Sequence, residues 1–280
     1  MQPPETPDQG ASSPARPAET EQWRQLLMGT DPEMNVLRNR WKHVPHGPRC
    51  KVCAAPFHGP GALLTRIMMH GRSVANPTMC QLCFRQLSDH PGGAEVEISI
   101  VFADIRGSTA IAERIGPVAF SEALQSFYEL GARAVEARDG FVDKYLGDGI
   151  MALFVPVFTG DDHSGRALSA AIDLVAAVEH SALPRSGIRV GAGAHRGPAF
   201  VGVLGSGDKL DFSALGDPVN VAARLGSIAG PGEVLASRDI WRAAGRDGGA
   251  GDAGEARRVE LAGRTEPLDV VVVRPTGAVA

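Results

Sequence analysis

The sequence contains no long hydrophobic run, no repeated segment and no excess of positive charge. A membrane-spanning helix needs about 20 consecutive apolar residues, so we expect no membrane span. Residues 1–20 also lack the apolar core of a secretory signal, and we therefore expect a cytoplasmic protein. The net charge of −4 argues against nucleic acid as a partner.

Cysteine is scarce, with four residues in a chain of 280. The cytoplasm keeps thiols reduced, so a disulfide framework is not expected. The cysteines form two C-x₂-C pairs, CKVC at 50–53 and CQLC at 80–83. Paired C-x₂-C motifs are typical of structural zinc sites with four thiolate ligands. We therefore expect a zinc ion bound by Cys50, Cys53, Cys80 and Cys83.

Two other uses of these cysteines stay open. The segment between the pairs, residues 54–79, is longer than the about 15–20 residues that usually separate such pairs. Four thiolates also hold iron–sulfur clusters, and two neighbouring thiols can form a redox pair. Because four thiolates already close a tetrahedral site, we expect His46, His58 and His70 to be surface residues.

Composition and hydrophobic periodicity divide the chain into four parts. These are a disordered, proline-rich tail at 1–20, a helical segment at 21–46, a cysteine module at 47–90 and an α+β domain at 95–275. Within the last part we expect a strand at 95–104, a helix at 119–139, a hairpin at 141–154, a helix at 163–180, two strands in 187–206 with a turn at 196–198, a helix at 217–229 and the final strands in 257–273.

Two aspartates are expected at the ends of strands. Asp104 closes its predicted strand and is followed by IRGST (105–109), a turn into a helix whose first N–H groups can bind an anion. Asp148 occupies the Gly-Asp-Gly turn of the predicted hairpin. If these strands are neighbours, both carboxylates lie at one edge of the sheet, where they could bind Mg²⁺ together with substrate phosphates. Taken singly, Asp104 also fits a helix cap, and Asp148 fits an ordinary turn residue.

Four segments of the C-terminal part resemble the motifs of one family, in that family's order. They are FADIRGST (102–109), KYLGDGIMALF (144–154), GAGAHRGPAFVGVLGS (191–206) and FSALGDPVNVAARL (212–225). Together they resemble the class III nucleotidyl cyclase catalytic domain over about residues 95–273, whereas any one motif alone would be weak evidence. The resemblance implies an α+β, ferredoxin-like βαββαβ fold with a mainly antiparallel sheet.

In this family two aspartates hold two metal ions, Mg²⁺ or Mn²⁺, in each active site. The resemblance assigns this role to Asp104 and Asp148, with the backbone carbonyl of Ile105 as a further ligand. It also implies that a turn holds the triphosphate, and this turn consists of Arg106, Gly107, Ser108 and Thr109. Arg264 falls where many of these enzymes have a phosphate-binding lysine, although an arginine there also fits an ordinary solvated loop residue.

The resemblance implies two further pairs of nucleotide-binding residues. Lys144 and Ser213 match the pair that reads the base. Asn220 and Arg224 match the pair that orients the ribose and neutralises charge developing on the phosphates. Guanylyl cyclases typically carry Glu and Cys at the base-reading positions, so this sequence favours ATP over GTP. Asp143 receives no role and is expected to be a solvated charge at the edge of a strand.

The implied reaction is attack of the ribose 3′-hydroxyl of ATP on its α-phosphate, which yields 3′,5′-cyclic AMP and pyrophosphate. In the family, the active site lies between two catalytic domains arranged head to tail. One subunit would supply the two aspartates and the other would supply the two nucleotide-binding pairs, so we expect a homodimer. The cysteine module would regulate the enzyme. Three alternatives stay open: a guanylate cyclase, a non-catalytic nucleotide-binding signalling protein, and an adaptor in which the cyclase fold mainly dimerises.

Overall fold

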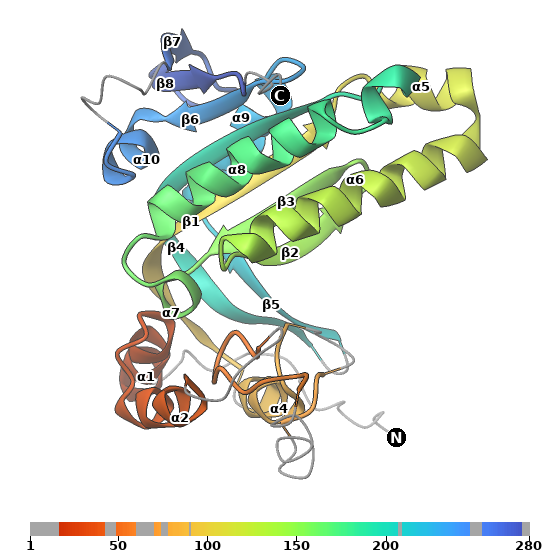
Figure 1. The fold of residues 1–280 in the computed structure, drawn as a ribbon. Helices are drawn as coiled ribbons and strands as arrows, with labels where there is room; N and C mark the ends of the chain where they lie inside the picture. Colours follow the sequence, from red (N-terminus) through yellow and green to blue (C-terminus); the bar gives the residue numbers. More distant parts are fainter. Residues whose placement is uncertain are drawn as a thin grey trace, which may run out of the picture.

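A mainly antiparallel β-sheet forms the centre of the computed structural model (Figure 1). The structure describes residues 17–42, 49–59, 70–73, 78–89, 91–206, 209–246 and 254–275. The sheet has eight strands in the order β2-β3-β1-β4-β6-β8-β7, and β5 pairs with β4 beside this path. β4 and β6 run parallel. The strands are β1 (Gly93–Ile105), β2 (Phe141–Leu146), β3 (Gly149–Phe154), β4 (Val190–Ser206), β5 (Lys209–Leu215), β6 (Val234–Ser237), β7 (Glu255–Val259) and β8 (Leu268–Val273).

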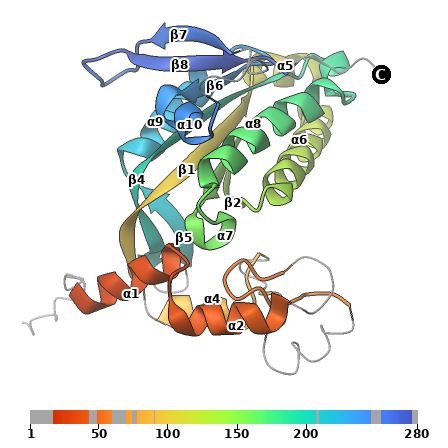
Figure 2. The same cartoon turned by 60° about the vertical axis from the view of Figure 1, so that its left-hand side comes forward.

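Helices cover both faces of this sheet. The long helices α6 (Pro117–Ala137) and α8 (His163–Glu179) lie on one face, and α9 (Asp217–Ile228) lies on the other (Figures 1 and 2). Helices packed on a mainly antiparallel sheet confirm the predicted α+β class. The shorter helices of this part are α5 (Ser108–Ile115), α7 (Pro156–Thr159), α10 (Arg238–Ala243) and the 3₁₀ helix Leu183–Ser186.

The long strand β4 replaces the two strands that were predicted in 187–206. It pairs with β1 along most of its length. On its other side it pairs with β6 at residues 192–194 and then with β5 from Phe200 onward. Pro198 lies between these two stretches, where no strand on that side needs an N–H from β4, so proline is tolerated. The turn predicted at 196–198 is therefore wrong.

The hairpin predicted at 141–154 is present as β2 and β3, which pair in antiparallel fashion. The pairing contains a β-bulge that the sequence pattern does not indicate. The register shifts between Val142 and Lys144, which leaves Asp143 without a partner on β3. Because a bulged residue interrupts the alternation of side chains along a strand, Asp143 and Lys144 can both face β5, and both contact it.

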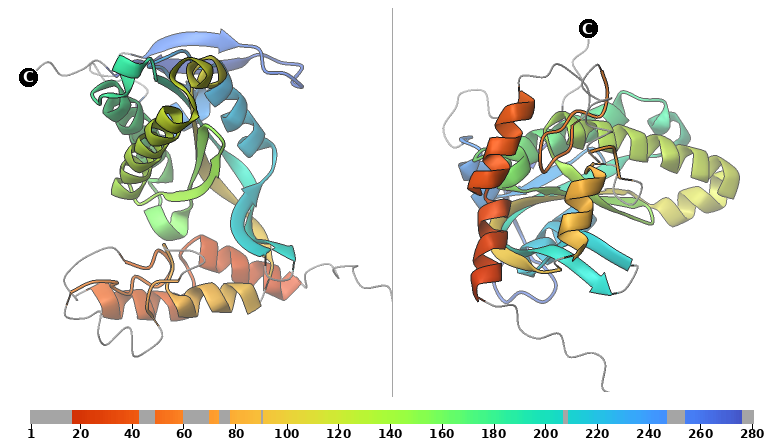
Figure 3. Two further views of the ribbon diagram at one scale, coloured as in Figure 1. Left: turned by 90° about the vertical axis from the view of Figure 1, so that its right-hand side faces the viewer. Right: turned by 90° about the horizontal axis from the view of Figure 1, so that it is seen from below.

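The N-terminal helices lie beneath the sheet, where β1 begins (Figures 1 and 3). They are α1 (Pro17–Leu27), α2 (Pro32–Lys42) and α4 (Gln81–Asp89). The first helix begins at Pro17, inside the predicted tail, because proline fits the first helical position and Glu19 favours a helix start. Residues 1–16 lie outside the described residues. Among the helices of the described ranges, none combines the length and the hydrophobicity that a bilayer crossing requires.

Two glycines allow α9 to lie directly against the sheet. A Cβ atom on Gly193 of β4 would overlap the helix backbone at Gly226, and a Cβ atom on Gly226 would lie 3.0 Å from that of Phe102. The helix and the strands therefore approach each other without side chains between them. This contact sets the distance of α9 from the sheet, and with it the positions of Asn220 and Arg224.

Replacing Gly193 with alanine is expected to push α9 away from β4, because the added methyl group overlaps backbone atoms that cannot rotate aside. We expect the free energy of unfolding, measured by urea denaturation, to fall by about 1–3 kcal/mol. The matched control is Gly165→Ala, where the methyl group meets only the side chain of Asp162 and the expected loss is below about 1 kcal/mol. An unchanged unfolding midpoint in Gly193→Ala would contradict the close contact.

Candidate active site

Asp104 and Asp148 lie side by side at one edge of the sheet. Asp104 ends β1 opposite Gly149 of β3, and the N–H of Ile105 donates to the carbonyl of Asp148 at 3.1 Å. Burial raises the pKa of Asp104 to about 6, while the guanidinium of Arg106 opposes this rise and the charge of Asp148 adds to it. Repulsion between two neighbouring carboxylates is what a bound cation relieves.

The surroundings of this aspartate pair, Asp104 and Asp148, fit a divalent metal ion. The Oδ1 atom of Asp104 is buried and has no hydrogen-bond partner among the described residues. Its Oδ2 atom accepts from Arg106 at 2.6 Å, and Arg106 also donates to the carbonyl of Ser227, in the last turn of α9, at 2.5 Å. A buried carboxylate oxygen without a partner is destabilising unless a donor or a cation reaches it. Oxygen ligands of this kind suit Mg²⁺ or Mn²⁺.

The turn from Arg106 to Thr109 connects β1 to α5. Gly107 has a φ of 68°, in the left-handed region that glycine adopts at little cost, and it precedes the first residue of the helix. No side chain caps α5, so its first N–H groups stay available to an anion. The side chain of Arg106 is engaged with Asp104, so phosphate binding at this turn would use backbone N–H groups and the hydroxyls of Ser108 and Thr109.

The structure brings Lys144 and Ser213, the base-reading pair, close together. The Nζ atom of Lys144 donates to Oδ2 of Asp211 at 2.9 Å, and Oγ of Ser213 donates to Oδ2 of Asp143 at 2.7 Å. Asp211 of β5 thus holds Lys144 of β2, and Asp143 of β2 holds Ser213 of β5. Asp211 and Ser213 alternate along β5 and therefore share one face of it.

Asp143 is not the solvated charge that the sequence suggested. The bulge turns its side chain toward β5, and its Oδ1 atom is buried without a hydrogen-bond partner among the described residues. Burial raises the pKa of Asp143 to about 6, while the hydrogen bond from Ser213 and the charge of Lys144 oppose this rise. Asp211 and Ser213 are two residues apart, and this spacing predicts that they share one face of their strand. It does not predict which strand they contact.

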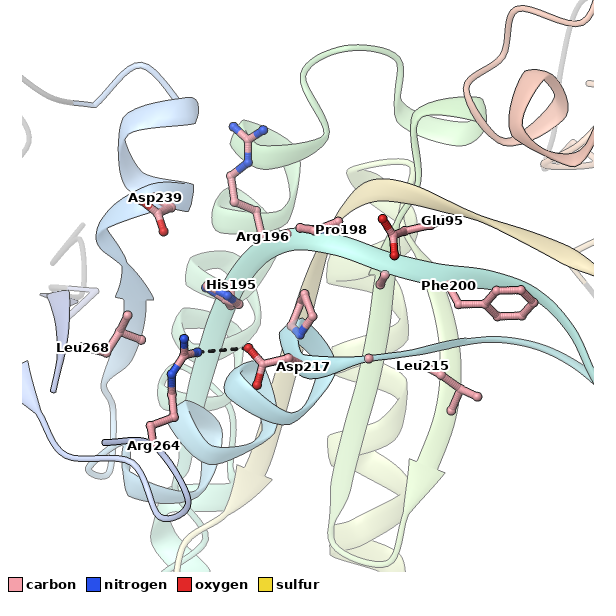
Figure 4. A pocket seen from close by; sticks show the side chains of 14 residues that line it. Glu95, His195, Arg196, Pro198, Phe200, Leu215, Asp217, Asp239, Arg264 and Leu268 are labelled. Atoms are coloured by element: carbon pink, nitrogen blue, oxygen red, sulfur yellow. Dashed lines mark hydrogen bonds and ion pairs between the residues drawn. The ribbon is translucent and has the colours of Figure 1, made fainter. Parts of the chain in front are cut away.

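The α9 pair, Asn220 and Arg224, lies one helical turn apart. The guanidinium of Arg224 reaches the loop before β8, where a Cβ atom on Gly263 would lie 3.3 Å from it. Arg264, the next residue of that loop, donates to Oδ2 of Asp217 at 3.1 Å. Figure 4 shows the side chains of Arg264 and Asp217 pointing toward each other in a cavity of about 640 Å³.

Of the predicted nucleotide-binding residues, only Arg264 lines the cavity of Figure 4. The cavity of Figure 4 contains Arg264 but neither member of the aspartate pair. Its buried His195 is held neutral, because burial lowers the pKa of that imidazole to about 4. Among the hydrogen bonds and ion pairs of the described residues, none joins the aspartate pair to the base-reading pair or to the α9 pair.

The four cysteines meet in one buried cluster, with all Sγ atoms within 4.8 Å of one another. The N–H of Cys80 donates to Sγ of Cys50 at 3.2 Å, and the N–H of Cys83 donates to Sγ of Cys80 at 3.4 Å. Hydrogen bonds within the cluster lower the pKa of the Cys80 thiol and raise that of Cys83. Four thiolates this close need a cation to balance their charge, and the set fits Zn²⁺ or an iron–sulfur cluster.

His70 is buried beside this cluster, so the prediction of a surface histidine was wrong. Only 4% of the residue is exposed, because Trp41 of α2 packs against its ring. Its Nδ1 atom lies 3.3 Å from Sγ of Cys80, where it can form a hydrogen bond that orients this sulfur. His58 is exposed as predicted, and His46 lies outside the described residues.

The catalytic part of the chain is similar to a known family and to several known proteins. Residues 93–269, more than half of the chain, match the family described as the adenylate and guanylate cyclase catalytic domain. The adenylate cyclase of Anabaena cylindrica is 36% identical over 139 residues, which cover 46% of this chain and 26% of that protein. Adenylate cyclase 1 of Rhizobium meliloti is 32% identical over 146 residues, which cover 49% and 22%. The chain thus spans about a quarter of the length of these curated relatives.

Solved structures share the fold. The guanylyl cyclase Cya2 aligns with a TM-score of 0.59 and 25% identity, covering 67% of this chain and 96% of that one. The adenylyl cyclase CyaB from P. aeruginosa aligns with a TM-score of 0.57 and 23% identity, covering 65% and 95%. The family match includes both the aspartate pair and the base-reading pair. This protein therefore belongs to the adenylate and guanylate cyclase catalytic domain family.

Proposed function

We propose that this protein is an adenylate cyclase that converts ATP to 3′,5′-cyclic AMP and pyrophosphate. The observation that carries the proposal is the aspartate pair, which lies at one sheet edge with a buried and unpaired carboxylate oxygen. The uncapped start of α5 follows directly and offers N–H groups to phosphates. The similarity to two adenylate cyclases supports the same chemistry.

The aspartate pair and the carbonyl of Ile105 would hold two Mg²⁺ or Mn²⁺ ions. Bound there, such ions would supply Lewis acidity for the ribose 3′-hydroxyl and for the leaving pyrophosphate. The turn from Arg106 to Thr109 would hold the triphosphate through its N–H groups. Asn220 would orient the ribose, and Arg224 would stabilise the charge that develops on the phosphates.

The base-reading pair favours ATP. Lys144 donates and can meet a ring nitrogen of adenine that accepts, whereas Ser213 can accept from the exocyclic amino group. Arg264 would add a positive charge near the phosphates. A reduced four-cysteine cluster and ATP as the substrate both fit the cytoplasm.

The active site would be completed by a second copy of the chain, arranged head to tail. The aspartate pair of one chain would then face the base-reading pair and the α9 pair of the other chain. Within one chain, no hydrogen bond or ion pair of the described residues joins the aspartate pair to either of these pairs, which supports this assembly. Several large apolar side chains next to these groups in sequence are exposed, and a second chain would cover them. They are Tyr145 and Leu146 on β2 at 48% each, Leu215 on β5 at 56% and Ile228 at the end of α9 at 45%.

Mixing two inactive variants tests the shared site. Asp104→Ala and Asn220→Ala should each lose at least about 100-fold of the cyclase activity, because each removes a group from every site. In an equimolar mixture, half of the dimers would carry one intact site of two, so about a quarter of the wild-type activity should return. The control mixes Asp104→Ala with Asp148→Ala, which leaves no site intact and should stay inactive. A mixture of the first two that forms dimers but stays inactive would contradict the shared site.

The nucleotide specificity is tested by direct product analysis. The full chain with Mn²⁺ should form cyclic AMP from ATP at least about tenfold faster than cyclic GMP from GTP, given the base-reading pair. Separation of the products by liquid chromatography measures both rates. Formation of cyclic GMP alone would make the protein a guanylate cyclase. Tight ATP binding without any product would identify a non-catalytic nucleotide-binding protein.

The cysteine module contacts the catalytic part next to β2. Lys51 lies between two of the clustered cysteines, and its Nζ atom is 3.7 Å from Oδ1 of Asp139. Asp139 also pairs with Arg166 and lies between α6 and β2, the strand that carries Lys144. We infer that the metal module regulates the cyclase through this contact, since a change at the cluster would reach the base-reading pair.

Metal analysis tests the identity of the cysteine site. Protein purified without oxygen should contain about one zinc ion per chain and no acid-labile sulfide, because four buried thiolates without other ligands form a closed zinc site. Cys83→Ser should lose this zinc, whereas Ser88→Ala on the same helix should retain it. Iron together with acid-labile sulfide would identify a cluster instead, and a metal-free wild-type protein would contradict the site.

A further inference from the structure

The β-bulge in β2 builds a polar cluster that the proposed function does not use in full. Asp143 and Lys144, which are consecutive in sequence, both face β5, where each contacts a different residue. Lys144 binds Asp211, whose side chain is 51% exposed. Asp143 binds Ser213, of which 2% is exposed. The outer part of the cluster, Lys144 and Asp211, is therefore exposed to solvent, whereas Ser213 in its inner part is buried.

The inner part of the cluster, Asp143 and Ser213, presents hydrogen-bond acceptors, and neither side chain has a proton left to donate. Ser213 has one hydroxyl proton and gives it to Oδ2 of Asp143 at 2.7 Å. The lone pairs of Ser213 and the Oδ1 atom of Asp143 remain, and this Oδ1 atom is buried without a partner among the described residues. Burial raises the pKa of Asp143 to about 6, while its bond to Ser213 and the charge of Lys144 favour the carboxylate form.

A buried carboxylate oxygen without a donor is destabilising, and a ligand that brings a donor is therefore favoured. The exocyclic amino group of adenine brings two N–H donors to this position. Guanine has a carbonyl oxygen at the same place on its ring, which would face acceptors and find no proton. Lys144 beside this cluster would be shared by both purines where it donates to N7, a ring acceptor that adenine and guanine both have, since N1 accepts only in adenine.

We propose that Asp143 is the residue that selects adenine over guanine, by keeping the inner end of the base pocket a site of acceptors only. The inference rests on the proposed function, because the ligand is the purine ring of the nucleoside triphosphate. A serine hydroxyl by itself can donate as well as accept, so Ser213 alone would not distinguish adenine from guanine. The carboxylate of Asp143 accepts the proton of Ser213 and makes this distinction. Ser213 then positions the carboxylate.

The variant Asp143→Asn tests this role with little change in shape. The side-chain oxygen of the introduced asparagine can still accept the hydrogen bond from Ser213. Its NH₂ group then lies where Asp143 has the unpaired Oδ1 atom. The acceptor becomes a donor that suits the carbonyl of guanine. We expect the ratio of kcat/KM for ATP to that for GTP to fall at least about tenfold. The reason is that one buried hydrogen bond to adenine is replaced by a contact between two donors.

Two variants serve as controls. Asp211→Asn makes the same substitution on the neighbouring carboxylate and weakens only an exposed ion pair with Lys144, so the ratio should change by less than about threefold. Ser213→Ala keeps the carboxylate of Asp143 and should keep most of the preference for ATP. If Ser213→Ala loses the preference while Asp143→Asn retains it, Ser213 is the reader and the proposal is wrong.

Binding measurements separate this proposal from the proposed function. Displacement of a fluorescent ATP analogue gives dissociation constants for ATP and GTP without any turnover, and the same fall in their ratio is expected for Asp143→Asn. If circular dichroism shows that Asp143→Asn is unfolded, Asp143→Ala replaces it, since it also removes the acceptor. A wild-type protein that forms no cyclic nucleotide contradicts the cyclase, whereas an unchanged binding ratio in a folded Asp143 variant contradicts the selection by Asp143.

Discussion

The pairing of β1 with β3 is the constraint on which the proposed site depends. It places Asp104 opposite Gly149 and brings the hairpin turn, with Asp148, to the end of β1. The backbone hydrogen bonds of this pairing keep the two residues next to each other, so the charges of their carboxylates repel. Burial raises the pKa of Asp104, the charge of Asp148 adds to this rise, and a divalent cation bound between the two carboxylates would relieve their repulsion.

The same hairpin carries the second half of the chemistry on its other strand. In β2 the bulge at Asp143 turns two consecutive charged residues toward β5, which an unbroken strand would have sent to opposite faces. Asp148 and Lys144 are four residues apart in this hairpin, yet no hydrogen bond or ion pair of the described residues joins the aspartate pair to the base-reading pair. In the proposed head-to-tail dimer, each hairpin would serve two active sites.

Much of this arrangement can be predicted from the sequence. The hairpin follows from two apolar runs around Gly-Asp-Gly, and the strand end at Asp104 follows from the buried run before it. The bulge cannot be predicted this way, because one extra residue leaves the hydrophobic pattern nearly unchanged, and the pattern alone therefore predicts a solvated charge at Asp143. His70 was misjudged for a related reason: Trp41, which buries it, is distant in sequence. Contacts between distant segments decide the burial of polar residues, and local patterns do not contain them.

The central claim is that Asp104 and Asp148 together bind the catalytic metal ions. Binding of Mn²⁺ to the full chain tests this claim. A non-cyclisable ATP analogue prevents turnover, and electron paramagnetic resonance of the free ion measures how much Mn²⁺ is bound. The account predicts about two ions per bound nucleotide in the wild type and a loss of at least one of them in both Asp104→Asn and Asp148→Asn. Unchanged Mn²⁺ binding in the two folded variants would contradict it.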